Sequence, residues 1–191
     1  MAVRAVFLVG FMASGKSRVG KELAQRLAWD FVDLDAQIEA REQRTIAALF
    51  QERGEPGFRA AETRTLRDLL TASLHRDHVV ALGGGAFVQE INRELLRPWP
   101  TVFLETAIEE LWQRSLTDHV ERPLRRSAEQ FAALYAERLP YYRQATITVV
   151  TSGRDPASLC AEIERNLQLV GNRNSDSSET FPASSETGES H

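Results

Sequence analysis

The chain has 191 residues, which is enough for one compact α/β domain and too few for two of ordinary size. Its apolar content of 42% and charged content of 26% are typical of a soluble globular protein. The formal net charge of −4 gives no general attraction for nucleic acid or for an acidic membrane surface. The single cysteine, Cys160, excludes an internal disulfide and a multi-cysteine metal site.

Membrane insertion and export are not indicated either. No apolar run in the sequence approaches the ~20 residues that a membrane-spanning helix needs. The N-terminal stretch MAVRAVFLVG is apolar, but it leads directly into a glycine-lysine loop and lacks a small-residue cleavage site. We therefore expect a cytoplasmic protein that binds neither nucleic acid nor membranes.

Five short runs rich in β-branched or aromatic residues predict strands at 5–9, 30–34, 78–82, 101–105 and 146–150. Four of them are mostly apolar on both faces, as in parallel strands that helices cover from both sides. Helical periodicity lies between them, in the segments after Ser17 and at 60–74, 107–117, 128–139 and 157–168. This alternation predicts βαβ crossovers and a three-layer α/β domain.

Three segments do not fit a plain alternation. The interval between the second and third predicted strands is longer than one crossover helix needs, so we interpret 36–74 as an inserted helical subdomain. Residues 118–127, DHVERPLRRS, are polar, basic and broken by Pro123, which predicts a loop that could cover a site. The end of the chain, 172–191, has too few apolar residues to offset its ordering entropy and is predicted to be disordered.

The most specific motif is GFMASGKS at 10–17, which follows the first predicted strand and opens a helix. Gly10 and Gly15 allow the backbone N–H groups of such a loop to point at phosphate oxygens. Lys16 would supply a charge to the β- and γ-phosphates, and Ser17 a hydroxyl ligand for Mg²⁺. The motif predicts a nucleoside triphosphate site.

Two carboxylates, Asp33 and Asp35, close the second predicted strand. In a parallel sheet this strand end emerges beside the phosphate loop, and the two-residue spacing would place both carboxylates on the same side of the chain. One could hold Mg²⁺ through water while the other contacts a phosphate acceptor. Alternatively, both residues cap the following helix.

Candidate acceptor-binding groups lie further along the chain. Arg59 stands at a predicted helix start, where a cation is unfavourable unless an anion is near. Glu62 could form an ordinary i,i+3 ion pair with it or hold it while it binds a substrate anion. Arg138 could bind the same anion or be a solvated residue. The glycines 83–85 would expose backbone N–H groups to a polar ligand, or form a flexible loop.

Taken in order, GFMASGKS, FVDLDAQIE, GEPGFRAAE, ALGGGAF, ERPL and ERLPYYRQA resemble the shikimate kinase family over residues 1–170. The resemblance implies a nucleoside-monophosphate-kinase type of P-loop fold with a central five-stranded parallel sheet. It implies a kinase domain over 1–171, with a substrate-binding subdomain at 36–74, a lid at about 115–127 and a tail at 172–191.

The resemblance also assigns roles to residues. Those that would contact ATP are Gly10, Ala13, Ser14, Gly15, Lys16, Ser17, Arg18, Arg114, Arg122 and Arg154. Those that would contact shikimate are Asp35, Phe50, Phe58, Arg59, Glu62, Gly83, Gly84, Gly85 and Arg138. Lys16, Asp35 and Arg122 would be catalytic, with Asp35 as the base, and Ser17 and Asp33 would hold Mg²⁺. Phe50 and Phe58 could equally be packing residues, while Arg114 and Arg154 lie in no sharp motif.

The sequence departs from the family's pattern at three positions. Ala13 stands where the loop often has glycine, Arg18 where threonine is usual, and Arg125 where the lid often continues with leucine. Ala13 and Arg18 leave Lys16 and Ser17 unchanged, whereas Arg125 affects the expected packing of the lid.

The reaction implied is ATP + shikimate → shikimate 3-phosphate + ADP, in the pathway to chorismate and the aromatic amino acids. We expect a monomer whose lid closes to exclude water. Two alternatives remain at this point. One is a related small-metabolite kinase, with gluconate or a nucleotide as acceptor, and the other is a regulatory module that binds or hydrolyses ATP without an acceptor.

Overall fold

The computed structural model describes residues 3–72, 75–117 and 127–169. These residues contain one sheet of five strands in the order β2-β3-β1-β4-β5, and every bonded pair of strands is parallel. The strands are β1 (Ala5–Val9), β2 (Asp30–Asp33), β3 (His78–Ala81), β4 (Thr101–Glu105) and β5 (Ile147–Val150). The predicted five-stranded parallel sheet is confirmed.

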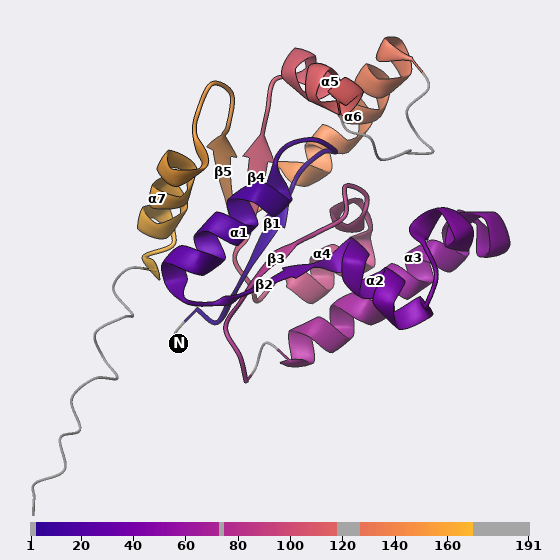
Figure 1. Cartoon of the computed structure of the whole chain (residues 1–191), viewed down its shortest axis with the longest axis horizontal. Helices are drawn as coiled ribbons and strands as arrows, with labels where there is room; N and C mark the ends of the chain where they lie inside the picture. Colours follow the sequence, from indigo (N-terminus) through magenta and orange to yellow (C-terminus); the bar gives the residue numbers. More distant parts are fainter. Residues whose placement is uncertain (1–2, 73–74, 118–126, 170–191) are drawn as a thin grey trace, which may run out of the picture.

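Helices cover both faces of this sheet (Figure 1). The helices are α1 (Lys16–Leu27), α2 (Leu34–Glu42), α3 (Ile46–Ala72), α4 (Glu90–Leu96), α5 (Ile108–Thr117), α6 (Ala128–Tyr142) and α7 (Pro156–Asn166), with a short 3-10 helix η1 (Ala86–Val88). Side chains of α1 and α7 form the core on one face, and those of α2 to α6 form it on the other. The three-layer arrangement is confirmed.

The central strand β1 explains why both faces need a cover. Val6 and Leu8 pack into the core under α1 and α7, whereas Ala5, Phe7 and Val9 pack into the core on the opposite face. All five side chains are buried. Because all the strands are parallel, their carboxyl ends share one edge of the sheet, and the loops that follow them meet there.

The end of β2 differs from the prediction. Asp33 ends the strand and α2 begins at Leu34, so Asp35 lies in the first turn of a helix and not in the strand. The Asp33 carboxylate accepts hydrogen bonds from the backbone N–H groups of Asp35 (3.1 Å) and Ala36 (3.4 Å), which fixes the helix start. The strand spacing used for the two carboxylates was therefore wrong, and Asp33 alone is the cap.

The long helix α3 starts earlier than the predicted 60–74 segment and is broken within its length. Gly54 has φ 65° and ψ −179°, which separates two helical segments, and Pro56 follows it. Glu42, at the end of α2, accepts hydrogen bonds from Arg53 before the break (2.7 Å) and from Arg64 after it (3.2 Å). One carboxylate thus ties both segments of α3 to α2.

Two further helices differ from the sequence-based expectation. The helix predicted at 128–139 continues through Pro140 to Tyr142. The short helix α4 was not predicted, because only Ile91, Leu95 and Leu96 among its residues are apolar. None of the helices within the described ranges is long and apolar enough to span a bilayer.

Parts of the predicted lid and tail lie outside the described residues. Of the lid range, Ser115–Thr117 end α5, and Ser127 caps α6 by accepting a hydrogen bond from the Gln130 N–H group (3.2 Å). Residues 118–126, which include Arg122 and Arg125, and the predicted tail at 172–191 are not among those that the structure describes.

An ion pair joins α1, the helix that carries Lys16 and Ser17, to α7. Arg26 donates from Nε (2.7 Å) and Nη2 (3.0 Å) to the two oxygens of Glu164, whose side chain is only 6% exposed. We expect Glu164→Gln to lower the free energy of unfolding by about 1–3 kcal/mol, because it removes a charged acceptor from a buried position. Urea denaturation of the two proteins measures the difference.

Glu94→Gln is the matched control, because the Arg97–Glu94 pair lies on the surface with side chains 75% and 55% exposed. An exposed pair contributes about 0–1 kcal/mol, so this variant should unfold almost as the parent does. Equal losses of unfolding free energy in both variants would show that the burial of Glu164 does not strengthen its ion pair.

Candidate active site

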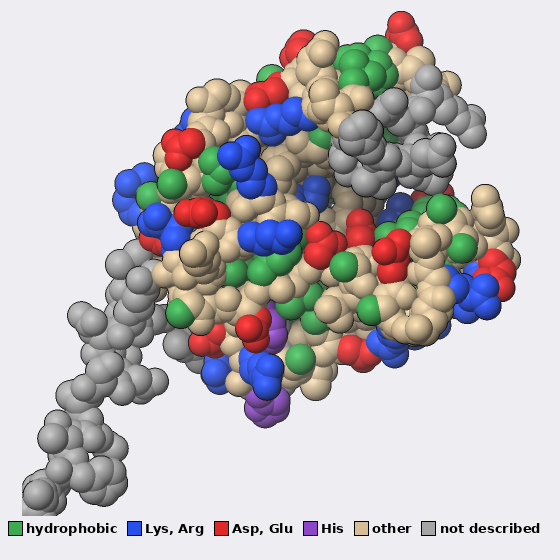
Figure 2. Space-filling view, in the orientation of Figure 1, with side chains coloured by type: hydrophobic (Ala, Val, Ile, Leu, Met, Phe, Trp, Pro, Cys, Tyr) green, Lys and Arg blue, Asp and Glu red, His purple; other side chains and the backbone are tan. Residues whose placement is uncertain are grey.

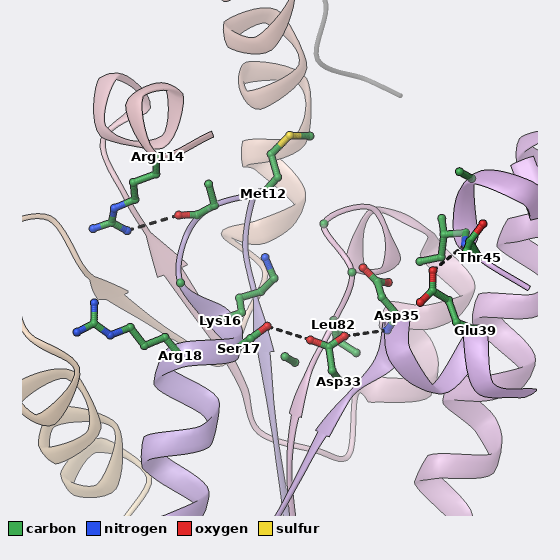
Figure 3. Close-up of a pocket in the computed structure, with 17 residues that line it drawn as sticks. Met12, Lys16, Ser17, Arg18, Asp33, Asp35, Glu39, Thr45, Leu82 and Arg114 are labelled. Carbon is green, nitrogen blue, oxygen red and sulfur yellow. Dashed lines mark hydrogen bonds between the residues drawn. The ribbon is translucent and has the colours of Figure 1, made fainter. Parts of the chain in front are cut away.

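A cavity of about 770 Å³ opens at the carboxyl edge of the sheet (Figure 3). The phosphate loop forms one side of it and the start of α2 forms the other, with the turn after β3 between them. The lining residues are Met12, Ala13, Gly15, Lys16, Ser17, Arg18, Asp33, Asp35, Glu39, Thr45, Ile46, Ala47, Ala81, Leu82, Gly83, Gly84 and Arg114. Most of the predicted phosphate-loop residues and both predicted aspartates thus face one space.

The loop has the geometry that phosphate binding requires. Gly10 has φ 148°, and a Cβ there would lie 3.0 Å from the Leu104 carbonyl oxygen, so only glycine fits. Gly15 precedes α1 with φ 87°, and no side chain caps the N–H groups at that helix start. Ala13 adopts φ 62°, a left-handed conformation in which glycine is preferred. The loop therefore presents an anion-binding helix N-terminus to the cavity.

Cations gather on the loop side of the cavity. The Lys16 ammonium donates to the carbonyls of Gly10 (3.0 Å) and Phe11 (2.8 Å) and so lies over the loop. Arg114 donates to the Ala13 carbonyl (3.5 Å), and Arg18 lines the same space. In Figure 2 the Lys and Arg side chains gather on one side of the hollow and the Asp and Glu side chains on the other. The cationic side suits a polyphosphate.

Ser17 and Asp33 form the candidate metal site. The Ser17 hydroxyl donates to Asp33 Oδ2 over 2.9 Å, so the two oxygens lie together at the cavity wall. No group of three His, Cys, Asp or Glu side chains suited to a metal occurs in the part of the chain that the structure describes. Mg²⁺ is bound through one or two carboxylates plus phosphates and water, so this sparse set of hard oxygen ligands fits it.

Asp35 lies against the first glycine of the turn after β3. A Cβ on Gly83 would lie 2.5 Å from Asp35 Oδ1 and 3.2 Å from Glu62 Oε1. The carboxylate therefore occupies the space that any other residue at position 83 would fill. This contact places Asp35 across the cavity from Lys16 (Figure 3).

Arg59 is held in place by two carboxylates. Its Nη1 donates to Glu62 Oε2 (2.9 Å), while Nε and Nη2 donate to Glu55 Oε1 (3.2 and 3.1 Å). A Cβ on Gly85 would lie 2.3 Å from Arg59 Nη2, so this glycine too makes room for a side chain. Burial raises the pKa of Glu62 to about 7, although Arg59 and Arg138 act in the opposite direction.

Arg138 reaches the same glycine turn from α6. It is 7% exposed, and its Nη1 donates to the Gly84 carbonyl over 3.3 Å. Tyr142, one turn further along α6, also donates to this carbonyl. Arg59, Gly85 and Arg138 line a second cavity of about 450 Å³. Asp35, Gly83 and Gly84 thus line the first cavity and Arg59, Gly85 and Arg138 the second, so these predicted acceptor residues lie in two cavities at the glycine turn and not in one.

Three predicted residues, Phe50, Phe58 and Arg154, line neither cavity, and a fourth is not among the described residues. Phe50 and Phe58 pack against each other with ring centroids 4.6 Å apart and are not among the described residues that line these cavities. Arg154 follows β5 and donates to Glu162 (2.6 Å) and the Val150 carbonyl (3.1 Å), away from the cavity lining. Arg122 lies outside the described residues.

Sequence reasoning missed the groups that support this site. Gln89 donates to Glu62 Oε2 over 2.6 Å, and Tyr142 binds the Gly84 carbonyl. Thr63 donates to Asn92 (2.9 Å), which donates to the Ala86 carbonyl (3.0 Å) and so ties α3 to the turn. Tyr142 belongs to the recognised ERLPYYRQA motif, whereas neutral polar residues such as Gln89 and Asn92 carry no signal in one sequence.

Comparison with known proteins identifies the family. The family model described as shikimate kinase matches residues 12–168. A shikimate kinase of Geobacter metallireducens is 41% identical over 170 residues, which are 87% of this chain and 93% of that protein.

Solved structures support the same family. Shikimate kinase from Acinetobacter baumannii in complex with shikimate has a TM-score of 0.80 and 35% identity, and covers 90% of this chain and 96% of that one. A gluconokinase from Sinorhizobium meliloti has a TM-score of 0.58 at 18% identity over 89% of this chain and 95% of that one, a likeness of fold alone. With this phosphate loop, this glycine turn and these relatives, the chain belongs to the shikimate kinase family.

Proposed function

We propose that this chain transfers the γ-phosphoryl group of ATP to the 3-hydroxyl of shikimate, giving shikimate 3-phosphate and ADP. The observation that carries the proposal is the glycine turn, at which the cavity with Lys16 and Asp35 meets the cavity with Arg59 and Arg138. A donor phosphate and an acceptor with hydroxyls at one end and a carboxylate at the other fit these two spaces.

On the donor side, catalysis rests on positioning and on neutralising charge. Phosphoryl transfer passes through a loose transition state with charge on the equatorial oxygens. Lys16 and the N–H groups at the start of α1 would bind these oxygens, with Arg18 and Arg114 along the rest of the polyphosphate. From its ERPL motif we assign Arg122 the role of the lid arginine, which would contact the same negatively charged oxygens. The ATP-binding role of Arg154 rests on motif alone.

On the acceptor side, Arg59 and Arg138 would bind the shikimate carboxylate. Two arginines from different helices can engage a carboxylate in a fixed geometry, which sets the register of the ring. Asp35 would then accept the proton of the 3-hydroxyl as that oxygen bonds to phosphorus. Gly83 to Gly85 keep the wall between these groups free of side chains. Phe50 and Phe58 would act behind this wall through packing.

Mg²⁺ would be held by Ser17 and Asp33 together with the phosphates. When bound, it supplies positive charge that neutralises the β- and γ-phosphate oxygens. The protein's own part is to keep the Ser17 hydroxyl and the Asp33 carboxylate 2.9 Å apart at the end of β2. The same carboxylate caps α2 and so ties this site to the helix that carries Asp35.

The remaining expectations concern the whole molecule. We propose that 36–74 acts as the substrate-binding subdomain, about 115–127 as the lid and 172–191 as a disordered tail. In support of the first, residues of α2 and α3 contribute Asp35 and Arg59. Because one chain supplies all the candidate groups, we expect a monomer, and we expect it to work in the cytoplasm.

The direct test offers ATP and Mg²⁺ with shikimate, gluconate or a nucleoside monophosphate and measures ADP release. We expect release with shikimate, and phosphorus NMR should place the new phosphate on the 3-oxygen. Turnover of gluconate without shikimate turnover would favour the related sugar kinases. ATP hydrolysis that no acceptor changes would favour a regulatory module.

We expect Asp35→Asn to lower kcat by about 10²–10⁴-fold with ADP binding nearly unchanged, because it removes only the base. Asp30→Asn at the opposite end of β2 is the matched control, since that carboxylate is exposed and distant from the cavity. Steady-state kinetics and ADP titration measure both effects. Near-normal turnover by Asp35→Asn would remove Asp35 from the mechanism.

We expect Arg138→Lys to raise the KM for shikimate by about tenfold, because an ammonium cannot reproduce the planar donor pair of arginine. Arg143→Lys, on an exposed side chain just after α6, is the control and should keep the parent KM. A KM unchanged in both variants would show that the shikimate carboxylate does not bind to Arg138.

The glycine turn offers a third test. We expect Gly83→Ala to lower kcat/KM for shikimate by at least about tenfold while the fold is kept, because the Cβ would displace the Asp35 side chain. Gly153→Ala is the matched control, since a Cβ there meets nothing within 4 Å and the residue lies away from the cavity lining. Equal activity of the two variants would show that Asp35 needs no such space.

A further inference from the structure

Glu62 is a fully buried carboxyl in the wall between the two cavities. Its Oε2 accepts hydrogen bonds from Arg59 Nη1 (2.9 Å) and Gln89 Nε2 (2.6 Å). Its Oε1 is buried without a hydrogen-bond partner among the described residues. This free oxygen faces Gly83, where it lies 3.2 Å from the position of a Cβ. A buried, ionised carboxylate oxygen without a donor is unfavourable, and the neutral protonated group costs less.

Charged groups of both signs from three helices surround Glu62. On α3, Arg59 contacts it directly, and Glu55 competes for that guanidinium. On α2, Asp35 lies against the same glycine and repels a second negative charge. On α6, Arg138 favours a negative charge on Glu62, and Gln89 before α4 is neutral. Two cations therefore face Glu62, and an anion that binds these cations makes the ionised form of Glu62 less stable.

We propose that Glu62 takes up a proton from solvent when the carboxylate of the acceptor binds to Arg59 and Arg138. The proposal rests on the function proposed above. A bound carboxylate adds a negative charge next to a buried carboxyl and takes over part of the positive charge that stabilised its ionised form. The protonated Glu62 keeps Arg59 and Gln89 as donors to Oε2 and places no charge on the free Oε1.

The pH range follows from the same groups. Burial, and less strongly Asp35, raise the pKa of Glu62 to about 7 in the free protein. Binding of an anion raises this pKa further, so the complex holds more protons than the free protein at and above this pH. Shikimate binding therefore weakens as the pH rises from about 7, by up to about tenfold for each unit by which the pKa moves. Below that range Glu62 is protonated in both states and adds no pH dependence.

The test is isothermal titration of the full chain with shikimate at about pH 8, in buffers that differ in ionisation enthalpy. The observed heat should depend on the buffer and report uptake of a fraction of one proton. The dissociation constant should rise between about pH 7 and pH 8.5. Glu62→Gln, which keeps the shape but cannot titrate, should lose both the buffer dependence and the slope.

Glu55→Gln is the matched control. Glu55 binds the same guanidinium, but its side chain is 61% exposed, so this variant should keep the proton uptake even if shikimate affinity changes. Absence of uptake in the parent protein, or uptake that persists in Glu62→Gln, overturns the proposal. Loss of uptake in both variants also overturns the proposal, because proton uptake would then depend on how Arg59 is held and not on a proton at Glu62.

An infrared measurement covers the case in which Glu62→Gln does not fold. In parent protein with ¹³C-labelled glutamate side chains, shikimate should increase the band of a protonated carboxyl group at about pH 8. No increase overturns the proposal. A protein that neither binds nor phosphorylates shikimate fails the function itself, whereas one that turns over shikimate without proton uptake fails only this inference.

Discussion

The site depends on the absence of side chains at two of the glycines that follow β3. Asp35 from α2 and Arg59 from α3 occupy the spaces that Cβ atoms on Gly83 and Gly85 would fill, at 2.5 and 2.3 Å. Between them, the Gly84 carbonyl accepts from Arg138 on α6. The turn is thus the point at which three helices meet. It can hold this place because β3 lies next to β1 in a parallel sheet, which brings the turn to the phosphate loop.

The charge distribution follows the same division. Lys16, Arg18 and Arg114 surround the phosphate loop, whereas Asp33, Asp35 and Glu39 line the facing wall. In the proposed function a polyphosphate would bind on the first side, and an acceptor hydroxyl would lose its proton on the second. In the proposed reaction the acceptor's carboxylate would bind separately, behind the glycine turn, to Arg59, which Glu55 and Glu62 hold in place, and to Arg138. Separate sites for the two anions would reduce their mutual repulsion until the phosphoryl group is transferred.

Much of this could be predicted from the sequence. The strand predictions agree with the structure to within one residue at each end, because apolar runs on both faces of a parallel sheet are distinctive. The phosphate loop and the glycine turn were visible as motifs. The position of Asp35 in a helix was not, since one hydrogen-bonded cap at Asp33 ends the strand early. Nor were the break at Gly54 and the burial of Glu62, which depend on contacts between distant segments.

The left-handed backbone of Ala13 bears on which sequences the loop tolerates. An alanine at φ 62° is strained by about 1–2 kcal/mol, but glycine at such a position loses about 0.4–1 kcal/mol more to unfolded-chain entropy. The strain exceeds this entropy, so Ala13→Gly should raise stability by about 1 kcal/mol, and position 13 accepts either residue at a small cost. Positions 83 and 85 have no such freedom, because there the limit is a collision with the side chains of Asp35 and Arg59. Within one site, alanine is therefore tolerated at the strained position 13 and excluded at positions 83 and 85, where space is shared.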